Sequence, residues 1–477
     1  MSFISFEFAL FLPLFLWVFH LTPARWRWLL VLMASYGFYW SWTPWFLSIL
    51  MGSTLVDYLA GLWLMKLKRR SVQAKSVLSL SLLFNLGMLI AFKYLGFFAD
   101  IMAAWSGERL DVFRAVVLPL GISFYTFQTL SYTIDVYRGR IRAERHLGRF
   151  ATFIAFFPQL LAGPIERAKD LLPQMHFQQE VTVENLTHGL RRVVWGLFKK
   201  LVIADRLAMF VNPAFRAPLD TSTEMMWLAA FFFLLQIYAD FSSYSDLAVG
   251  ISRMIGVKLS ENFAHRVYWV HSFRSFWANW HRTMTNWFRD YVFFSLSSLR
   301  SGRVWLMLFA IVTFALNGLW HGARSTFVIW GLLNGVLMVA EQLWSPLWTR
   351  GVARHPTWMR QLLGFVVAMP LVTLMVVLFR AKSEANAFEV YHTLFHATVA
   401  KGSLPWEVEH AHFKDFVFLI PALVFMDGAH WHFGKMSIEE RLQTWSPALR
   451  LSAYIGLTSV ILWFGVPERY EFIYFDF

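Results

Sequence analysis

The chain has 477 residues, of which 57% are hydrophobic and 15% are charged, and its mean hydropathy is +0.48. Soluble proteins carry roughly 25% charged residues, so the composition excludes a soluble protein and indicates an all-α polytopic membrane protein. The net charge of +13 comes from basic residues in short loops between apolar runs, which is typical of membrane topology and not of nucleic-acid binding. The lack of cysteine excludes disulfides and thiolate catalysis.

The first five apolar runs lie near residues 4–20, 28–42, 45–65, 76–99 and 113–135. The loop after the third run contains Lys66, Lys68, Arg69 and Arg70, and such basic loops stay in the cytoplasm. This places the N-terminus on the outer side of the membrane. The first run has no basic region before it and no cleavage site after it, so we expect a retained helix and not a signal peptide.

Segment 149–175 is apolar but short, and it contains Pro158, Gly163 and Pro164. A broken apolar segment favours a re-entrant element, with a proline-kinked helix as the alternative. Runs near 193–211 and 226–251 follow. Asp240 and Asp246 lie in the second of these without a local cation, so we expect each to face a cavity or a buried donor.

Residues 252–303 mix arginines with aromatic side chains and do not resemble membrane spans. Phe276, Trp280, Trp287 and Tyr291 recur at helical spacing, which predicts an interfacial amphipathic helix with its basic face toward the cytoplasm. Further apolar runs lie near 304–320, 326–344, 361–379, 416–427 and 450–466. We therefore predict one membrane domain over 1–477, with N-terminal spans in 1–135, core motifs in 149–345 and C-terminal spans in 360–477.

His321 ends the apolar run that begins near Val304, within the stretch LNGLWHGAR. A titratable side chain at membrane depth is costly and marks a functional site by default, and imidazole can accept a proton near neutral pH. Asn317, Gly318 and Gly322 leave room around the ring. His281 lies 40 residues earlier and could share acid–base work if the fold brings the two rings together. The alternative is that both histidines are structural.

Two other histidine patterns have weaker support. His410 and Asp415 have the His-x4-Asp spacing of some soluble acyltransferases, but so short a pattern arises easily by chance. His410, His412, His430 and His432 form two pairs that could bind a metal ion, but no other ligand spacing accompanies them. We predict no metal site and no nucleophile elbow.

Four motifs together carry a family resemblance. They are FPQLLAGPI (157–165), YADFSSYSDLAVG (238–250), FWANWHRTMTNWFRDYVF (276–293) and LNGLWHGARSTFVIWGLLNG (316–335). They resemble the membrane-bound O-acyltransferase superfamily, in particular its bacterial branch for O-acetylation of polysaccharides such as alginate. The resemblance implies a bundle of about 11–12 transmembrane helices around a central tunnel, with re-entrant and interfacial helices. The residues at 262–268 and 297–298 depart from the branch pattern, which leaves the polymer open.

The resemblance also implies site residues. His321 matches the catalytic histidine of the superfamily, and His281 matches the second histidine of this branch. We expect His321 to take a proton from an acceptor hydroxyl, and His281 to orient the thioester or stabilise the oxyanion together with Asn317. Asp240 or Asp246 could orient a histidine, as a carboxylate does in a triad.

The expected donor is cytosolic acetyl-CoA, used as a substrate, with no permanently bound cofactor. Basic side chains near the inner face could meet its phosphates. These candidate donor-binding residues are Arg274, Arg282 and Arg289, with Trp320 beside them.

The resemblance implies relay of the acetyl group to a periplasmic or membrane-anchored partner acetyltransferase, which then modifies an exported polysaccharide. Direct transfer to a lipid-linked sugar is an open alternative. A proton-coupled transporter or channel that uses the buried histidines is the alternative of another class, although we find no internal repeat to support it. A scaffold without chemistry is a third possibility.

Overall fold

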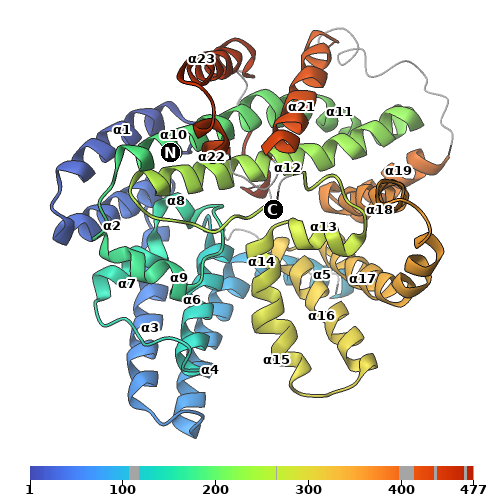
Figure 1. Cartoon of the computed structure of the whole chain (residues 1–477). Coiled ribbons are helices and arrows are strands. Elements are labelled where there is room, and N and C mark those ends of the chain that lie inside the picture. Colours follow the sequence, from blue (N-terminus) through green and yellow to red (C-terminus); the bar gives the residue numbers. More distant parts are fainter. Residues whose placement is uncertain (107–117, 265, 397–412, 434–437, 467–469, 476–477) are drawn as a thin grey trace. The chain divides into compact units, whose positions relative to one another are not determined.

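The computed structural model describes residues 1–106, 118–264, 266–396, 413–433, 438–466 and 470–475, and every regular element in these ranges is a helix (Figure 1). The prediction of an all-α polytopic membrane protein is confirmed. The chain folds into two compact units, 1–193 with 244–261 and 194–243 with 262–477. The long helix α12 (Thr223–Met254) contributes residues to both units.

Seven helical segments in the described ranges are long and apolar enough to cross a bilayer. They are α3, the continuous segment from α4 through η1 into α5, and α12, α16, α17, α18 and α23. Helix α1 is apolar but only 16 residues long. The expected total of about 11–12 spans stays a prediction.

Several helical segments precede α12 in the described residues of the first unit. They are α1 (Phe6–Leu21), α2 (Ala24–Trp40), α3 (Phe46–Lys66), α4 (Val72–Leu89) with η1 (Ile90–Tyr94), α5 (Leu95–Ser106), α6 (Ile122–Tyr137), α7 (Leu147–Ala155), α8 (Phe157–Leu160), α9 (Ala168–Leu171) with η3 (Leu172–His176), and the start of α10 (Val183–Phe198). The segment 149–175 is broken, as predicted. It forms the short helices α7 to η3, which are separated by Phe156 and by the turn around Gly163.

A buried polar network joins three helices of the first unit. The carboxylate of Asp57 on α3 accepts hydrogen bonds from Ser81 at 2.5 Å, Asn85 at 2.8 Å and Thr133 at 2.9 Å. These donors lie on α4 and α6. A polar group in hydrocarbon must find a partner inside the protein, so this network specifies how α3, α4 and α6 pack.

The folding stability of the first unit depends on pH through Glu166. Its carboxylate is 2% exposed and accepts hydrogen bonds from the backbone N–H and the hydroxyl of Ser260. Burial raises its pKa to about 7, and Asp170 adds to the rise while the Ser260 bonds and Arg167 oppose it. The folded state therefore favours the protonated acid. This contribution to stability is fully present below the unfolded pKa, near 4.5, and is lost as pH rises through about 7.

We therefore expect the melting temperature of the detergent-solubilised protein to fall between pH 5 and pH 9, and Glu166→Gln to remove part of that fall. The contribution at stake is about 3 kcal/mol, at ~1.4 kcal/mol for each unit of pKa. Thermal unfolding of both proteins across this pH range measures it. Parallel pH profiles for the wild type and Glu166→Gln would contradict the assignment.

The second unit holds the motifs at 276–293 and 316–335 and the first six residues of the motif at 238–250. Its segments are η4 (Lys199–Ala204), α11 (Asp205–Arg216), η5 (Pro218–Asp220), α13 (Phe273–Asn279), α14 (Arg282–Trp287), η6 (Phe288–Phe293), α15 (Phe294–Ser297), α16 (Arg303–His321), α17 (Ser325–Val352), α18 (Thr357–Arg380), α19 (Glu384–Phe395), α21 (Phe413–Phe433), α22 (Ile438–Gln443), α23 (Pro447–Phe464) and η7 (Ile473–Phe475).

The prediction of one interfacial amphipathic helix through 276–291 is wrong. The helix breaks at Trp280 and His281, where His281 has a φ of 38° and caps α14. Phe276, Trp280, Trp287 and Tyr291 are all buried, so this aromatic face packs inside the protein and not against lipid. Helical spacing alone cannot distinguish these two environments.

Helices α16 and α17 approach each other closely enough to fix the position of His321. A methyl group on Gly318 would lie 2.2 Å from the carbonyl oxygen of Phe327, and one on Gly331 would lie 2.4 Å from that of Phe314. Small residues let membrane helices pack backbone to backbone. The glycines of LNGLWHGAR and WGLLNG therefore hold the end of α16 rigidly against α17.

Candidate functional site

The imidazole of His321 lies in a cage of aromatic rings at the C-terminal end of α16. It is 3% exposed. Ring centroids lie 4.9 Å away for Trp320, 5.1 Å for Phe379, 5.2 Å for Trp330 and 5.7 Å for Tyr474. Four segments therefore meet at this histidine: α16, α17, α18 and the C-terminal tail.

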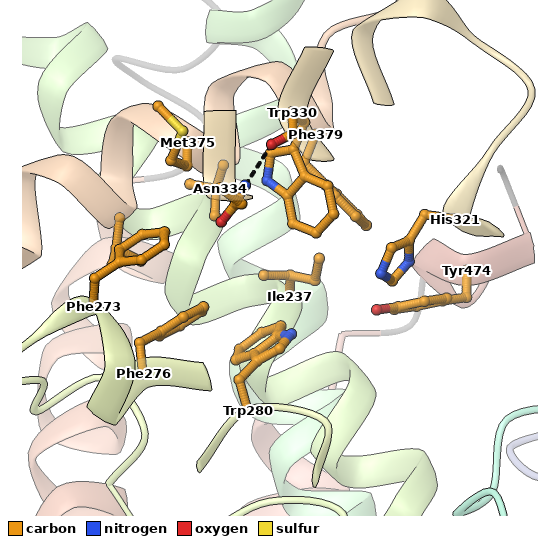
Figure 2. Close-up of a pocket in the computed structure, with 12 residues that line it drawn as sticks. Ile237, Phe273, Phe276, Trp280, His321, Trp330, Asn334, Met375, Phe379 and Tyr474 are labelled. Carbon is orange, nitrogen blue, oxygen red and sulfur yellow. Dashed lines mark hydrogen bonds between the residues drawn. The ribbon is translucent and has the colours of Figure 1, made fainter. Parts of the chain in front are cut away.

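A cavity opens beside this ring, with room for about one water molecule, about 20 Å³. We call it the histidine cavity. Figure 2 shows the imidazole of His321 at its edge, with the hydroxyl of Tyr474 turned into the same space. The other lining residues are Ile237, Phe273, Phe276, Trp280, Trp330, Asn334, Val372, Met375, Val376 and Phe379. The cavity thus combines one base, one phenol and one amide with an otherwise apolar wall.

A buried ion cluster anchors the tail that carries Tyr474. The ammonium of Lys200 lies 2.8 Å from carboxylate oxygens of both Asp205 and Asp240. The second oxygen of Asp240 accepts a hydrogen bond from the backbone N–H of Ile473 at 2.8 Å. The three charged side chains are 1–2% exposed. Asp240 therefore joins the α12 helix to the residue just before Tyr474.

Two further bonds fasten the chain that leads into the tail. Arg206 donates to the carbonyl oxygen of Phe464 at 2.8 Å, and the N–H of Val466 donates to the carbonyl oxygen of Leu201 at 3.0 Å. Lys200 and Leu201 lie in the π-helical turn η4, a distortion that often occurs at functional sites. The turn presents Lys200 to the cluster and the Leu201 carbonyl to the tail.

Replacing Asp240 by Ala should release the tail, whereas Asp240→Asn should hold it, because an amide oxygen can still accept the Ile473 bond. Both variants lose the same charge, so both should be destabilised by about 3–5 kcal/mol. The chain has no cysteine, so the maleimide labelling rate of Ile473→Cys reports on tail release. We expect faster labelling with Asp240→Ala than with Asp240→Asn. Equal rates would show that this bond does not hold the tail.

His281 lies beside the histidine cavity but is not among its lining residues. Its ring is fully buried, and its Nδ1 is 2.8 Å from Oδ1 of Asn262, which also accepts from the hydroxyl of Thr283. Burial lowers the pKa of His281 to about 3, so the ring is neutral at physiological pH. A neutral ring that donates through Nδ1 presents Nε2 as an acceptor.

That tautomer bears on the expected role of His281. An acceptor nitrogen cannot donate a hydrogen bond to an oxyanion, so the oxyanion role requires the other tautomer. Trp320 and Tyr474 pack against both histidines: their ring centroids are 6.1 and 6.5 Å from His281 and 4.9 and 5.7 Å from His321. The fold therefore brings His281 and His321 against the same two rings.

A second, larger cavity of about 440 Å³ lies along the middle and the C-terminal half of α16, from Ala310 to Asn317. Arg274, Arg282 and Arg289 all line it, together with Asn317. Asn317 is one helical turn before His321. We call this the arginine cavity. The structure thus collects the three arginines that the sequence proposes for donor binding, and whether they bind a donor stays a prediction.

Aromatic rings separate the arginine cavity from the histidine cavity. Trp277 lines the first and packs edge-on against Trp330 of the second, at 5.7 Å between centroids. Phe288 also lines the arginine cavity and packs against Trp320 at 6.5 Å. Trp320 lines neither cavity and packs against Phe288, His281 and His321.

Asp240 and Asp246 each face a buried donor, one of the two environments expected from the sequence. Asp240 pairs with Lys200 and the Ile473 N–H, and Asp246 accepts from Arg192 at 2.6 Å. Arg192 also bonds Glu261 at 2.6 Å. Both aspartates therefore form ion pairs with cations distant in sequence, and the orientation of a histidine by either one stays a prediction. No cation lies near either aspartate in the sequence, but the fold brings a distant cation to each of them.

Neither His430 nor His432, which lie on α21, lines the histidine cavity. His410 and His412 lie outside the described residues. His430 is buried on α21, where its Nδ1 lies 3.3 Å from the hydroxyl of Tyr268.

Sequence reasoning missed several residues of the histidine cavity. Tyr474 is the most important, because it brings a hydroxyl group next to His321. Its signal was the aromatic tail at the end of the chain, in which tyrosine is the residue with transferable chemistry. Asn334, Trp330 and Phe379 have no signal that separates them from ordinary residues of a membrane helix.

Comparisons with known proteins show to which family the chain is similar. The profile of the membrane-bound O-acyltransferase family matches residues 28–379. The chain is 39% identical to the probable alginate O-acetylase AlgI of Azotobacter vinelandii over 81% of this chain and 76% of that protein. It is 38% identical to the same-named protein of Pseudomonas aeruginosa, over 81% and 73%. It is 30% identical to the peptidoglycan O-acetyltransferase of Helicobacter pylori, over 78% and 73%.

Proposed function

The chain belongs to the membrane-bound O-acyltransferase family and is an acyltransferase of polysaccharide acetylation, and from this premise we propose that it moves an acetyl group from cytosolic acetyl-CoA to an acceptor on the outer face of the bacterial inner membrane. His321 is the catalytic base. One observation carries the proposal: a buried imidazole and a phenol share the histidine cavity, close to a second cavity lined with arginines. The family assignment decides against a transporter and against a scaffold without chemistry.

The expected membrane topology assigns each cavity to one half of the bilayer. Basic loops stay in the cytoplasm, which places Arg300 and Arg303, before α16, on the inner face and the N-terminus on the periplasmic side. Helix α16 then runs outward and carries His321 toward the outer half of the membrane. The arginine cavity opens on the inner half, where its three guanidinium groups suit the phosphates of acetyl-CoA.

The chemistry starts from the acceptor hydroxyl. Burial raises the pKa of the Tyr474 hydroxyl above its usual range, so this phenol must give its proton to a base in order to act as a nucleophile. His321 takes that proton, the phenolate oxygen attacks the thioester carbonyl carbon, and the carbon–sulfur bond breaks. The departing thiolate recovers the proton from His321. The product is an acetyl ester on Tyr474.

The ester then passes to the partner acetyltransferase, which modifies the polysaccharide. The apolar wall of the histidine cavity would protect the ester from water. The polymer itself is not specified by these residues.

Purified protein in sealed liposomes tests the proposal. Acetyl-CoA labelled in its acetyl group is supplied to the arginine-cavity face, and label is measured on the protein and on an added partner acetyltransferase. We expect label on the protein first and on the partner later. Absence of any transfer, with intact folding, would overturn the proposal for this donor. Movement of protons without transfer would support the transporter alternative.

A further inference from the structure

A third cavity in the second unit lies where α11 and α18 end and α19 begins (Figure 1). Its volume is about 390 Å³, within the range of sites that bind small ligands. Its lining residues are Asn212, Phe215, Arg216, Arg380, Lys382 and Asn386. Three of these six carry a positive charge and none carries a negative one.

The arrangement of these groups favours an anion. The guanidinium of Arg380 donates to Asn212 at 2.9 Å and lies over the rings of Phe215 and Phe233, so its position is set before any ligand binds. The N-terminus of the 12-residue helix α19 adds a partial positive charge at the same place. The acidic residue next in sequence, Glu384, accepts from the hydroxyl of Ser325 and does not line the cavity.

The position of the cavity relative to the membrane indicates which anion it meets. Arg380 is the last residue of the spanning helix α18, so the cavity lies at the level where lipid headgroups begin. Helix α19, which follows it, exposes Phe388 and Phe395, at 71% and 61%. Residues seven positions apart share one helix face, and an exposed apolar face next to a basic group is the pattern of a helix lying in the membrane interface.

We propose that this cavity binds the phosphate of an anionic phospholipid headgroup, with α19 lying along the same leaflet. Arg216, Arg380 and Lys382 make charge-assisted hydrogen bonds to the phosphate oxygens, and the side-chain amides of Asn212 and Asn386 can bind the neighbouring hydroxyl groups. The site lies at the His321 end of α16, since Arg324, just after α16, donates to the carbonyl oxygen of Ala381 at 3.3 Å. The proposal concerns a site separate from the acetyl-transfer chemistry.

The site has a structural link to the histidine cavity. Arg380 follows Phe379, whose ring packs 5.1 Å from that of His321. A headgroup that holds the end of α18 also holds Phe379 against the catalytic ring. We therefore expect lipid binding to stabilise this end of the bundle.

The test compares two double variants. Arg216→Gln with Lys382→Gln removes two exposed charges from the cavity and leaves Arg380 in place to preserve packing. Arg350→Gln with Arg354→Gln removes two exposed charges from the opposite end of α17 and is the matched control. Binding of phosphatidylglycerol is measured by native mass spectrometry of the full chain, with phosphatidylcholine as the neutral lipid.

The expected result is that the wild type and the control retain phosphatidylglycerol in preference to phosphatidylcholine. The cavity variant should bind phosphatidylglycerol about 25-fold more weakly, about fivefold for each charge removed. Equal binding by the cavity and control variants would overturn the proposal.

Two further arms identify the source of the anion. Inorganic phosphate and a uronic-acid oligosaccharide are each added to the protein in phosphatidylcholine, with thermal stability as the readout. We expect neither to stabilise the wild type, because neither brings acyl chains for the exposed face of α19. Stabilisation by either one that is lost in the cavity variant would show that the cavity binds a free phosphate or a sugar carboxylate, and would overturn the lipid assignment.

Discussion

Replacing His321 by Gln is expected to reduce acetyl transfer by about 10²–10⁴-fold, the usual contribution of a positioned general base. Glutamine fills a similar volume and can form hydrogen bonds, so the aromatic cage should persist, but it cannot take the proton of the attacking hydroxyl. Transfer of labelled acetyl from acetyl-CoA, with membrane levels of the protein matched, measures the loss.

The control for this experiment is another buried histidine. His430 is also only 3% exposed, and it lines neither the histidine cavity nor the arginine cavity. His430→Gln should therefore retain transfer if the protein folds, which size-exclusion chromatography and thermal unfolding would establish. Activity of His321→Gln within about tenfold of the control would remove the catalytic assignment.

Tyr474→Phe is expected to lower transfer to the partner by about 10²-fold or more, because it deletes the hydroxyl that accepts the acetyl group. The change removes one oxygen atom and keeps the ring, so its packing against Phe241 at 4.3 Å and against His321 at 5.7 Å should remain. Mass spectrometry of the C-terminal peptide, after incubation of the wild type with acetyl-CoA, should detect an acetyl group on Tyr474. His321→Gln should abolish that adduct.

Tyr470→Phe is the matched control, because it removes a hydroxyl from the same tail outside the histidine cavity. It should leave transfer intact. If Tyr474→Phe transfers acetyl as fast as Tyr470→Phe does, the acceptor is another hydroxyl that reaches His321 directly. In that event the relay through the tail is wrong while the role of His321 stands.

The two aspartates illustrate how far sequence reasoning reaches at this site. A carboxylate in an apolar helix must have a partner, and Asp240 and Asp246 both have one. The partners, Lys200 and Arg192, are distant in sequence, so no local pattern could reveal them. The tail anchor at Ile473 depends on a contact between residues 233 positions apart, which only folding creates.

The three arginines, in contrast to the aspartates, could be placed from the local sequence. Arg274, Arg282 and Arg289 lie in one short stretch whose helices form a local turn, so their position around one cavity follows largely from local sequence. Even here the helix expected through 276–291 breaks at His281. The break turns the aromatic side chains inward, and it depends on the hydrogen bonds that Asn262 makes to His281 and to Thr283.

The sequence by itself determined the class of molecule, the principal apolar runs and the histidine most worth testing, because hydropathy and the cost of a buried titratable group are local properties. Tertiary structure alone decided which hydroxyl meets His321, which cations neutralise the buried aspartates and where the third basic cavity lies. Each of these depends on side chains from separate helices meeting at one point, and the free energy of such a meeting is distributed over contacts that no single stretch of sequence contains.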